Sequence, residues 1–186
     1  MGAHNYVGSR SGYRSKAPIP EFLALYFAFN ARLSRILLQL AVVGLSLICA
    51  AVLYQVFGRY VLNDSPTWTE ISALVVVLYV TVFAAAVGVR DSRHIGMESV
   101  LTFMPPEPRK WIEIFVFCGM IVFGLAMAYG GTILANSVWD YMNPGLPISQ
   151  GWSYVPIGGG GLLIVYFAIE QIIARLLDIE VVASWH

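Results

Sequence analysis

Charged residues are scarce in this sequence. They make up 12% of the 186 residues, whereas 58% are hydrophobic, and a soluble domain is usually about 25% charged. The formal net charge is zero, so no overall field attracts nucleic acid. Both absences favour an integral membrane protein, and we expect no nucleic acid among its partners.

Cysteine and histidine are also rare, with two and three copies. Cys49 and Cys118 lie inside apolar runs, where we expect small buried apolar side chains rather than a disulfide or metal pair. A haem-binding anchor needs axial ligands inside its helices. His4 and His186 lie near the chain ends, which leaves only His94, in a connecting segment. No cluster of acids, His or Ser has the spacing of a hydrolase site. We therefore expect no catalytic site, metal or cofactor.

Long apolar runs dominate what the sequence does contain. A helix that crosses the hydrocarbon of a membrane needs roughly 20 apolar residues. Four segments meet this requirement, and each is read as an α-helix because a lipid-exposed backbone must satisfy its own hydrogen bonds. The expected spans are residues 36–57, 71–89, 111–135 and 155–177. The predicted fold class is an all-α membrane protein with four transmembrane helices.

Lysine and arginine are unevenly placed along the chain. Of the eleven Lys and Arg residues, only Arg59 falls on one side of the membrane if both termini share the other. The remaining ten are Arg10, Arg14, Lys16, Arg32, Arg35, Arg90, Arg93, Arg109, Lys110 and Arg175. Cytoplasmic loops carry an excess of Lys and Arg. We therefore predict that both termini and residues 90–110 are cytoplasmic.

The spans form one membrane domain, residues 36–177, between cytoplasmic tails 1–35 and 178–186. Within the first tail, residues 21–35 mix aromatics with a basic end, and they form either an interfacial amphipathic helix or an inward extension of the first span. Between the second and third spans, residues 97–104 carry apolar side chains at helical spacing. This pattern predicts a short helix along the cytoplasmic membrane surface.

Small residues recur four apart within the spans. Ala84 with Gly88, and Gly124 with Ala128, form small-xxx-small pairs. Such pairs let helix backbones approach closely. We expect all four residues to lie at helix contacts.

Charged residues inside the spans are few. A charge at mid-membrane costs at least about 2.5–3.5 kcal/mol, so a retained one suggests a role. Glu113 and Glu170 both lie near the ends of their spans, and Glu170 is the deeper. An ion pair with a basic residue of this chain or a partner explains Glu170 most simply, and a coupling carboxylate is the alternative. The first two spans carry no mid-span charge, which favours a structural or scaffolding subunit over a transport pathway.

Two polar clusters frame the second span. The first is residues 55–63 (QVFGRYVLN), followed by Trp68, Thr69 and Glu70; the second is residues 90–98 (RDSRHIGME), before the expected surface helix. Residues 152–158 (WSYVPIG) open the fourth span. In this order, these features resemble the small membrane subunit of tripartite ATP-independent periplasmic (TRAP) transporters. Ile71 departs from the pattern, because it replaces the second of the family's paired glutamates.

The resemblance implies a function for the chain. TRAP transporters import organic anions, commonly carboxylates, on a sodium gradient across the bacterial cytoplasmic (inner) membrane. A periplasmic substrate-binding protein delivers the substrate to a large multi-span permease of the elevator type. The small subunit is expected to bind this permease as a non-catalytic scaffold, with no substrate or metal site of its own. The alternative is a membrane anchor subunit of a redox or other enzyme complex.

The resemblance also implies positions for the polar residues. Arg59, Trp68 and Glu70 are expected at the outer face, where Arg59 is placed to pair with Glu70, and plain interfacial anchoring is the alternative. Three residues are expected at the inner face, in contact with membrane lipid phosphates or the large subunit: Arg90, Arg93 and His94. A hydrogen bond at a helix start is an alternative for His94.

Overall fold

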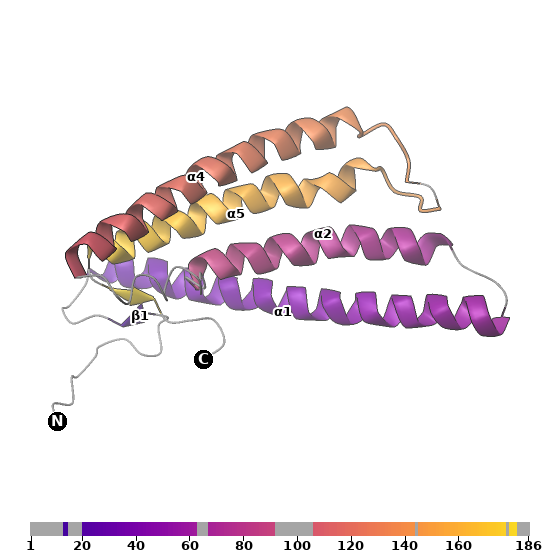
Figure 1. Cartoon of the computed structure of the whole chain (residues 1–186), viewed down its shortest axis with the longest axis horizontal. Helices are drawn as coiled ribbons and strands as arrows, with labels where there is room; N and C mark the ends of the chain where they lie inside the picture. The colour runs from indigo at the N-terminus through magenta and orange to yellow at the C-terminus, as the bar shows by residue number, and fades with distance from the viewer. Residues whose placement is uncertain are drawn as a thin grey trace, which may run out of the picture.

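Four long helices make up most of the computed structural model (Figure 1), which describes residues 13–14, 20–62, 67–91, 106–143, 145–177 and 179–181. The helices are α1 (Glu21–Phe57), which continues as the π-helical turn η1 (Gly58–Leu62), α2 (Thr67–Arg90), α4 (Pro106–Ser137) and α5 (Gly151–Leu176). All four are long and apolar enough to cross a membrane, which confirms the expected all-α membrane architecture. The predicted surface helix lies outside the described residues.

Helix α1 is the longest element. Its 37 residues span about 55 Å at 1.5 Å per residue, compared with about 30 Å for the hydrocarbon of a bilayer. The helix is continuous from Glu21. Residues 21–35 therefore extend the helix of the first span, which is one of the two alternatives that the sequence left open.

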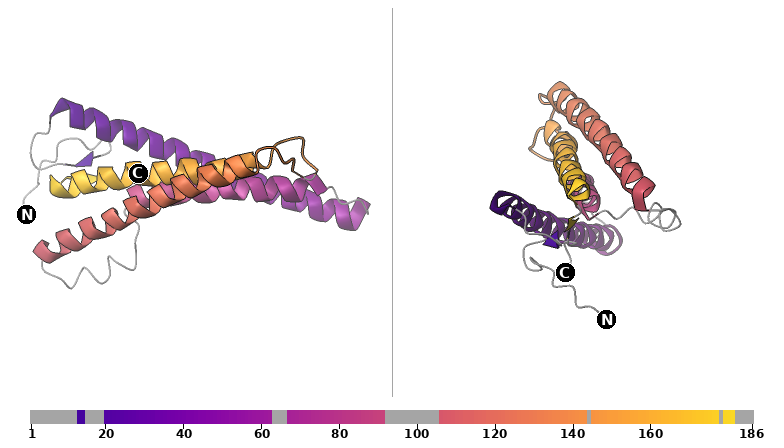
Figure 2. Two further views of the ribbon diagram at one scale, coloured as in Figure 1. Left: turned by 90° about the horizontal axis from the view of Figure 1, so that it is seen from above. Right: turned by 90° about the vertical axis from the view of Figure 1, so that its left-hand side faces the viewer.

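The helices pair as two antiparallel hairpins. α1 packs against α2 and α4 against α5, and the contact between α2 and α5 joins the hairpins. Viewed along the bundle, α5 lies between α4 and the α1–α2 hairpin (Figure 2). The short strands β1 (Tyr13–Arg14) and β2 (Glu180–Val181) pair antiparallel. We call the end of the bundle where α1 begins and α5 finishes the terminal end, and the opposite end the loop end.

Burial is concentrated toward the terminal end. The main core cluster brings together side chains of all four helices, among them Leu37, Ala86, Phe117 and Phe167. Within α1, every buried residue lies between Phe27 and Gly44, although the helix runs on for more than ten residues. The ribbons of the two hairpins diverge toward the loop end (Figure 1). The hairpins therefore make their main buried contacts toward the terminal end.

Glycine sets the close packing of α4 on α5. A Cβ added at Gly131 would meet the backbone of Gly158, and one added at Gly161 would meet backbone atoms of Gly124 and Ala128. The expected contact at Gly124 and Ala128 is therefore confirmed.

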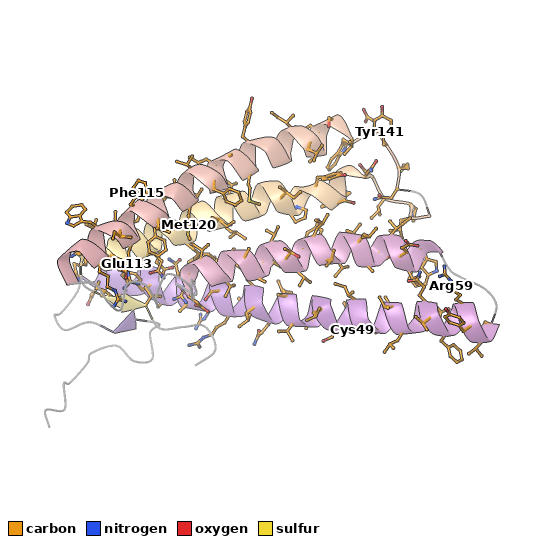
Figure 3. All side chains as sticks on the ribbon, viewed as in Figure 1. Cys49, Arg59, Glu113, Phe115, Met120 and Tyr141 are labelled. Atoms are coloured by element: carbon orange, nitrogen blue, oxygen red, sulfur yellow. The ribbon has the colours of Figure 1, made fainter. Side chains whose placement is uncertain are left out.

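The helix contact expected at the other small-residue pair, Ala84 and Gly88, is wrong within this chain. A Cβ at Gly88 would meet nothing within 4 Å, and Ala84 is exposed. Both cysteines are free, but they depart from the expected burial, because Cys49 and Cys118 are exposed on the helix surfaces (Figure 3 labels Cys49). Lipid tails are as apolar as leucine, so an apolar run does not distinguish a core-facing residue from a lipid-facing one.

The connection between α4 and α5 is ordered at the loop end. The backbone N–H of Asn143 donates to Ile148 O at 3.0 Å, and that of Gln150 donates to Tyr141 O at 2.7 Å. Gly145 has a φ of 82°, which other residues adopt rarely. Trp139 and Trp152 pack with ring centroids 5.9 Å apart. Aromatic packing and turn geometry thus fix the start of α5.

Candidate functional site

A buried ion pair joins the two hairpins near the terminal end. Arg90 is the last residue of α2, and its Nε lies 3.3 Å from Oε2 of Glu170 in α5; both side chains are fully buried. Arg90 Nη1 also lies 3.6 Å from Oδ1 of Asp91. The sequence predicted an ion pair for Glu170, and the structure shows one within this chain.

Uncharged polar groups surround this ion pair. Gln171 donates from Nε2 to the backbone carbonyl of Arg90, and Tyr166 donates from its hydroxyl to Asn30 Oδ1 at 2.7 Å. Asn30 is fully buried in α1. We call the six residues that bring α1, α2 and α5 together the buried polar cluster: Asn30, Arg90, Asp91, Tyr166, Glu170 and Gln171.

The predicted role of Arg90 at the membrane surface is wrong. Its side chain was expected to contact lipid phosphates or the large subunit, but none of it is exposed on this chain. The reason is the position of α5, which places Glu170 at the level of the end of α2. A buried guanidinium is costly unless a carboxylate compensates it, so Arg90 turns inward toward its partner.

A second ion-pair cluster joins α4 to α5. Oε1 of Glu113 lies 2.9 Å from Nε of Arg109, one turn earlier on α4, and Oε2 lies 2.8 Å from Nε of Arg175 on α5 (Figure 3 labels Glu113). Glu113 is 6% exposed, whereas the side chains of Arg109 and Arg175 are 39% and 32% exposed. One carboxylate thus bridges two arginines at the edge of the bundle.

The residues expected at the outer face lie at the loop end. Arg59 is exposed in η1, Glu70 is exposed in α2, and no ion pair between them is recorded among the described residues. Trp68 is 48% exposed and packs on Tyr54 of α1, with ring centroids 6.3 Å apart. This aromatic contact holds α1 against α2 at the loop end, while the roles of Arg59 and Glu70 stay predictions.

Two of the predicted residues, Arg93 and His94, lie outside the described residues. In contrast, Asn30, Tyr166 and Gln171 were not among the residues predicted from the sequence. Polar side chains in membrane helices usually face the bundle interior. Applying that rule to the polar residues close to Glu170 in the sequence would have indicated Tyr166 and Gln171, whereas Asn30 lies in the segment assigned to the N-terminal tail.

Both ion-pair clusters join helices of this chain. Among the residues that the structure describes, no group of three or more His, Cys, Asp or Glu side chains could hold a metal ion. Glu113 and Glu170 both form ion pairs with arginines of the same chain. Such pairs fix the rotation and register of neighbouring helices, because each charge is stable only beside its partner.

Comparison with known proteins agrees with this arrangement. Residues 48–178 match the family model for the DctQ component of tripartite ATP-independent periplasmic transporters. The chain is also similar to the sialic acid TRAP transporter small permease protein SiaQ of Vibrio cholerae, with 23% identity over 125 residues, 66% of this chain and 71% of that protein. Together with the four apolar helices, these matches indicate a multi-pass protein of the bacterial inner membrane. The chain belongs to the DctQ family and is the small permease subunit of a TRAP transporter.

Proposed function

We propose that the chain is the non-catalytic scaffold subunit of a sodium-coupled secondary importer of organic anions, with carboxylates as the substrate class. It binds and stabilises a large permease subunit of the elevator type, and a periplasmic substrate-binding protein docks on the assembled complex. The relative in Vibrio cholerae is named for sialic acid, which carries a carboxylate, and this supports an anionic substrate.

The observation that carries the proposal is the internal pairing of the membrane carboxylates. Sodium needs oxygen ligands, and an organic anion needs a cation. Glu170 is already engaged with Arg90, and Glu113 with two arginines. Using either carboxylate in transport would break an ion pair that joins two helices in or near the membrane. The chain is suited to support a transport pathway in another subunit.

Reconstitution tests this assignment. Proteoliposomes would hold the chain alone, the co-expressed permease alone, or both, and each would receive the purified binding protein, a carboxylate substrate and a sodium gradient. We expect substrate uptake only with both membrane subunits, and its loss when the sodium gradient is collapsed. Uptake by the chain alone would refute the scaffold function, and uptake without a sodium gradient would refute the coupling.

The polar residues at the ends of the bundle are the proposed interface. Arg59, Trp68 and Glu70 at the loop end, and Arg93 and His94 in the segment after α2, would contact the permease or lipid headgroups. We expect Arg59→Ala and His94→Ala to reduce the amount of permease that co-purifies with the chain. Arg32→Ala removes an exposed cation of α1 and serves as the matched control. If both variants retain the permease and uptake like the control, the proposed interface is wrong.

A further inference from the structure

A groove opens between α2 and the start of α5 at the loop end. Its volume is about 280 Å³. Its α2 lining consists of aliphatic side chains from a single face, namely Ile71, Leu74, Val75 and Leu78, and its other lining residues are polar, namely Asn143, Gln150, Ser153 and Tyr154. The groove is therefore apolar along one side and polar at its mouth.

The packing of the two hairpins creates this groove. Deeper in the bundle, Gly160 of α5 lets Val82 of α2 approach its backbone closely. One turn nearer the loop end, Tyr79 donates from its hydroxyl to Trp152 O at 3.0 Å. Beyond these contacts the hairpins diverge (Figure 1). The groove is thus a consequence of fixed helix contacts.

The depth of the groove matches the outer part of a bilayer leaflet. Trp68 marks the loop end of α2, and tryptophan prefers the headgroup level. Residues 71–78 lie about 5–15 Å deeper along the helix, at 1.5 Å per residue. Leu74 is 60% exposed, so the groove is open to the surrounding hydrocarbon. An occupant must be polar at the interface and apolar below it.

We propose that the groove binds one phospholipid of the leaflet at the loop end. An acyl chain lies along the aliphatic face of α2, and the Gln150 amide bonds to ester or phosphate oxygens, beside Asn143, whose Nδ2 already donates to Ser149 O at 3.4 Å. The bilayer itself places a molecule of this polarity against the groove, because Leu74 opens to the hydrocarbon and Trp68 lies at the headgroup level beside it.

The polar lining predicts which lipids bind. A side-chain amide is an uncharged donor, so it can bond to zwitterionic and anionic phospholipids alike. Binding should also be insensitive to salt, because screening acts on pairs of charges. Both properties distinguish this groove from a basic site for anionic lipids.

Native mass spectrometry of the full-length chain, extracted from its membrane in a mild detergent, tests the proposal. The wild type should retain one phospholipid per chain. Leu74→Trp fills the groove and should reduce retention at least tenfold. Val77→Trp places the same ring on α2 at a 40% exposed position that does not line the groove, and it should retain lipid like the wild type.

A second variant controls for the case in which Leu74→Trp loses lipid because it folds poorly. Gln150→Ala removes one amide without filling the groove, and the Gln150 side chain makes no capping hydrogen bond to α5. Losing one hydrogen bond should lower phospholipid retention about fivefold. Equal retention in the wild type, Leu74→Trp and Gln150→Ala would overturn the proposal.

The assembled complex separates a lipid from a protein occupant. A photoreactive side chain at position 74, irradiated in native membranes that contain the permease, should form adducts with phospholipid. Adducts with the permease, together with loss of the retained lipid on assembly, would show that a partner fills the groove and would overturn the proposal.

Discussion

Arg90 and Glu170 are fully buried, so neither side chain can exchange its partner for water. Their environments differ, however. Arg90 keeps a second carboxylate, Asp91, at 3.6 Å if Glu170 is neutralised. Among the ion pairs recorded for the described residues, Glu170 has Arg90 as its only cation. The two halves of this ion pair should therefore respond differently to substitution.

Removing the arginine should be more damaging than neutralising the glutamate. Arg90→Met leaves a buried carboxylate without its cation and should lower the free energy of unfolding by about 3–5 kcal/mol. Glu170→Gln is nearly isosteric and should cost about 2 kcal/mol, the value of a hydrogen bond to a charged group. Thermal unfolding of the purified chain in detergent measures both changes.

The double variant is the control for this comparison. Replacing both Arg90 and Glu170 by Met removes this pair of charges together and should recover most of the stability that Arg90→Met loses, because apolar replacements of a buried pair are often neutral. The remaining cost is that of Asp91, whose side chain is 2% exposed and loses its arginine. Uptake by the assembled transporter should survive Glu170→Gln in proportion to the folded protein. Loss of uptake by a fully stable Glu170→Gln variant would instead identify a coupling carboxylate.

The ion pairs of Glu113 should contribute less to stability than the buried polar cluster does. Its arginine side chains are 39% and 32% exposed, so water and lipid headgroups can replace the carboxylate, and exposed ion pairs contribute at most about 1 kcal/mol. We expect Glu113→Gln to lower the free energy of unfolding by about 1 kcal/mol in the same assay. An effect as large as that of Arg90→Met would contradict this ranking.

At the scale of the helices, two adjacent glycines of α4 differ sharply. A Cβ at Gly131 would overlap the backbone of Gly158, whereas one at Gly130 would meet nothing within 4 Å. Gly131→Ala should therefore separate α4 from α5 and cost about 1–3 kcal/mol of stability. Gly130→Ala should be neutral or should stabilise the helix by about 0.5–1 kcal/mol. The difference in melting temperature between these variants tests the packing, and equal values would refute it.

Helix α5 contains a proline that explains one contact between the hairpins. Pro156 lies inside the helix and has no N–H, so the carbonyl of Trp152, four residues earlier, lacks its usual helical donor. The Tyr79 hydroxyl supplies a hydrogen bond to this carbonyl at 3.0 Å. The contact thus compensates a defect within α5 and also joins α5 to α2.

This compensation predicts a specific coupling. Tyr79→Phe should cost about 0.5–1 kcal/mol, the usual value of a hydrogen bond between membrane helices. Pro156→Ala restores the backbone donor, so in that background the same Tyr79→Phe change should cost almost nothing. A double-mutant cycle on thermal stability measures the coupling. Equal costs in both backgrounds would show that Tyr79 acts by packing alone.

For the whole molecule, the sequence was sufficient to predict the helices but not which side chains meet. Residues 71–89 predict a span because hydropathy reports contact with an apolar environment. Arg90, at the end of that run, resembles an interfacial anchor until α5 is placed beside it. Cys49 and Gly88 show the same limit, because lipid and protein core are equally apolar. Which side chains meet depends on how each helix is rotated and how the helices cross. The composition of the sequence determines neither.

The orientation of the whole molecule in the membrane can be tested directly. The pairing of Tyr13 with Val181 indicates that both tails leave the bundle on the same side, and ten of the eleven Lys and Arg residues favour the cytoplasm for that side. In a chain whose native cysteines are replaced by alanine, Asp140→Cys at the loop end should react with a membrane-impermeant maleimide in intact cells.

Cysteines in the two tails complete this test. His186→Cys and His4→Cys should react with the same maleimide only after the cells are permeabilised. The two tail positions must behave alike, because the strand pair ties their segments together. Labelling of both tails in intact cells would show that the orientation is the reverse of the predicted one. It would also move Arg59, Trp68 and Glu70 to the cytoplasmic face, where a periplasmic binding protein has no access, so the proposed arrangement of the complex would fail with it.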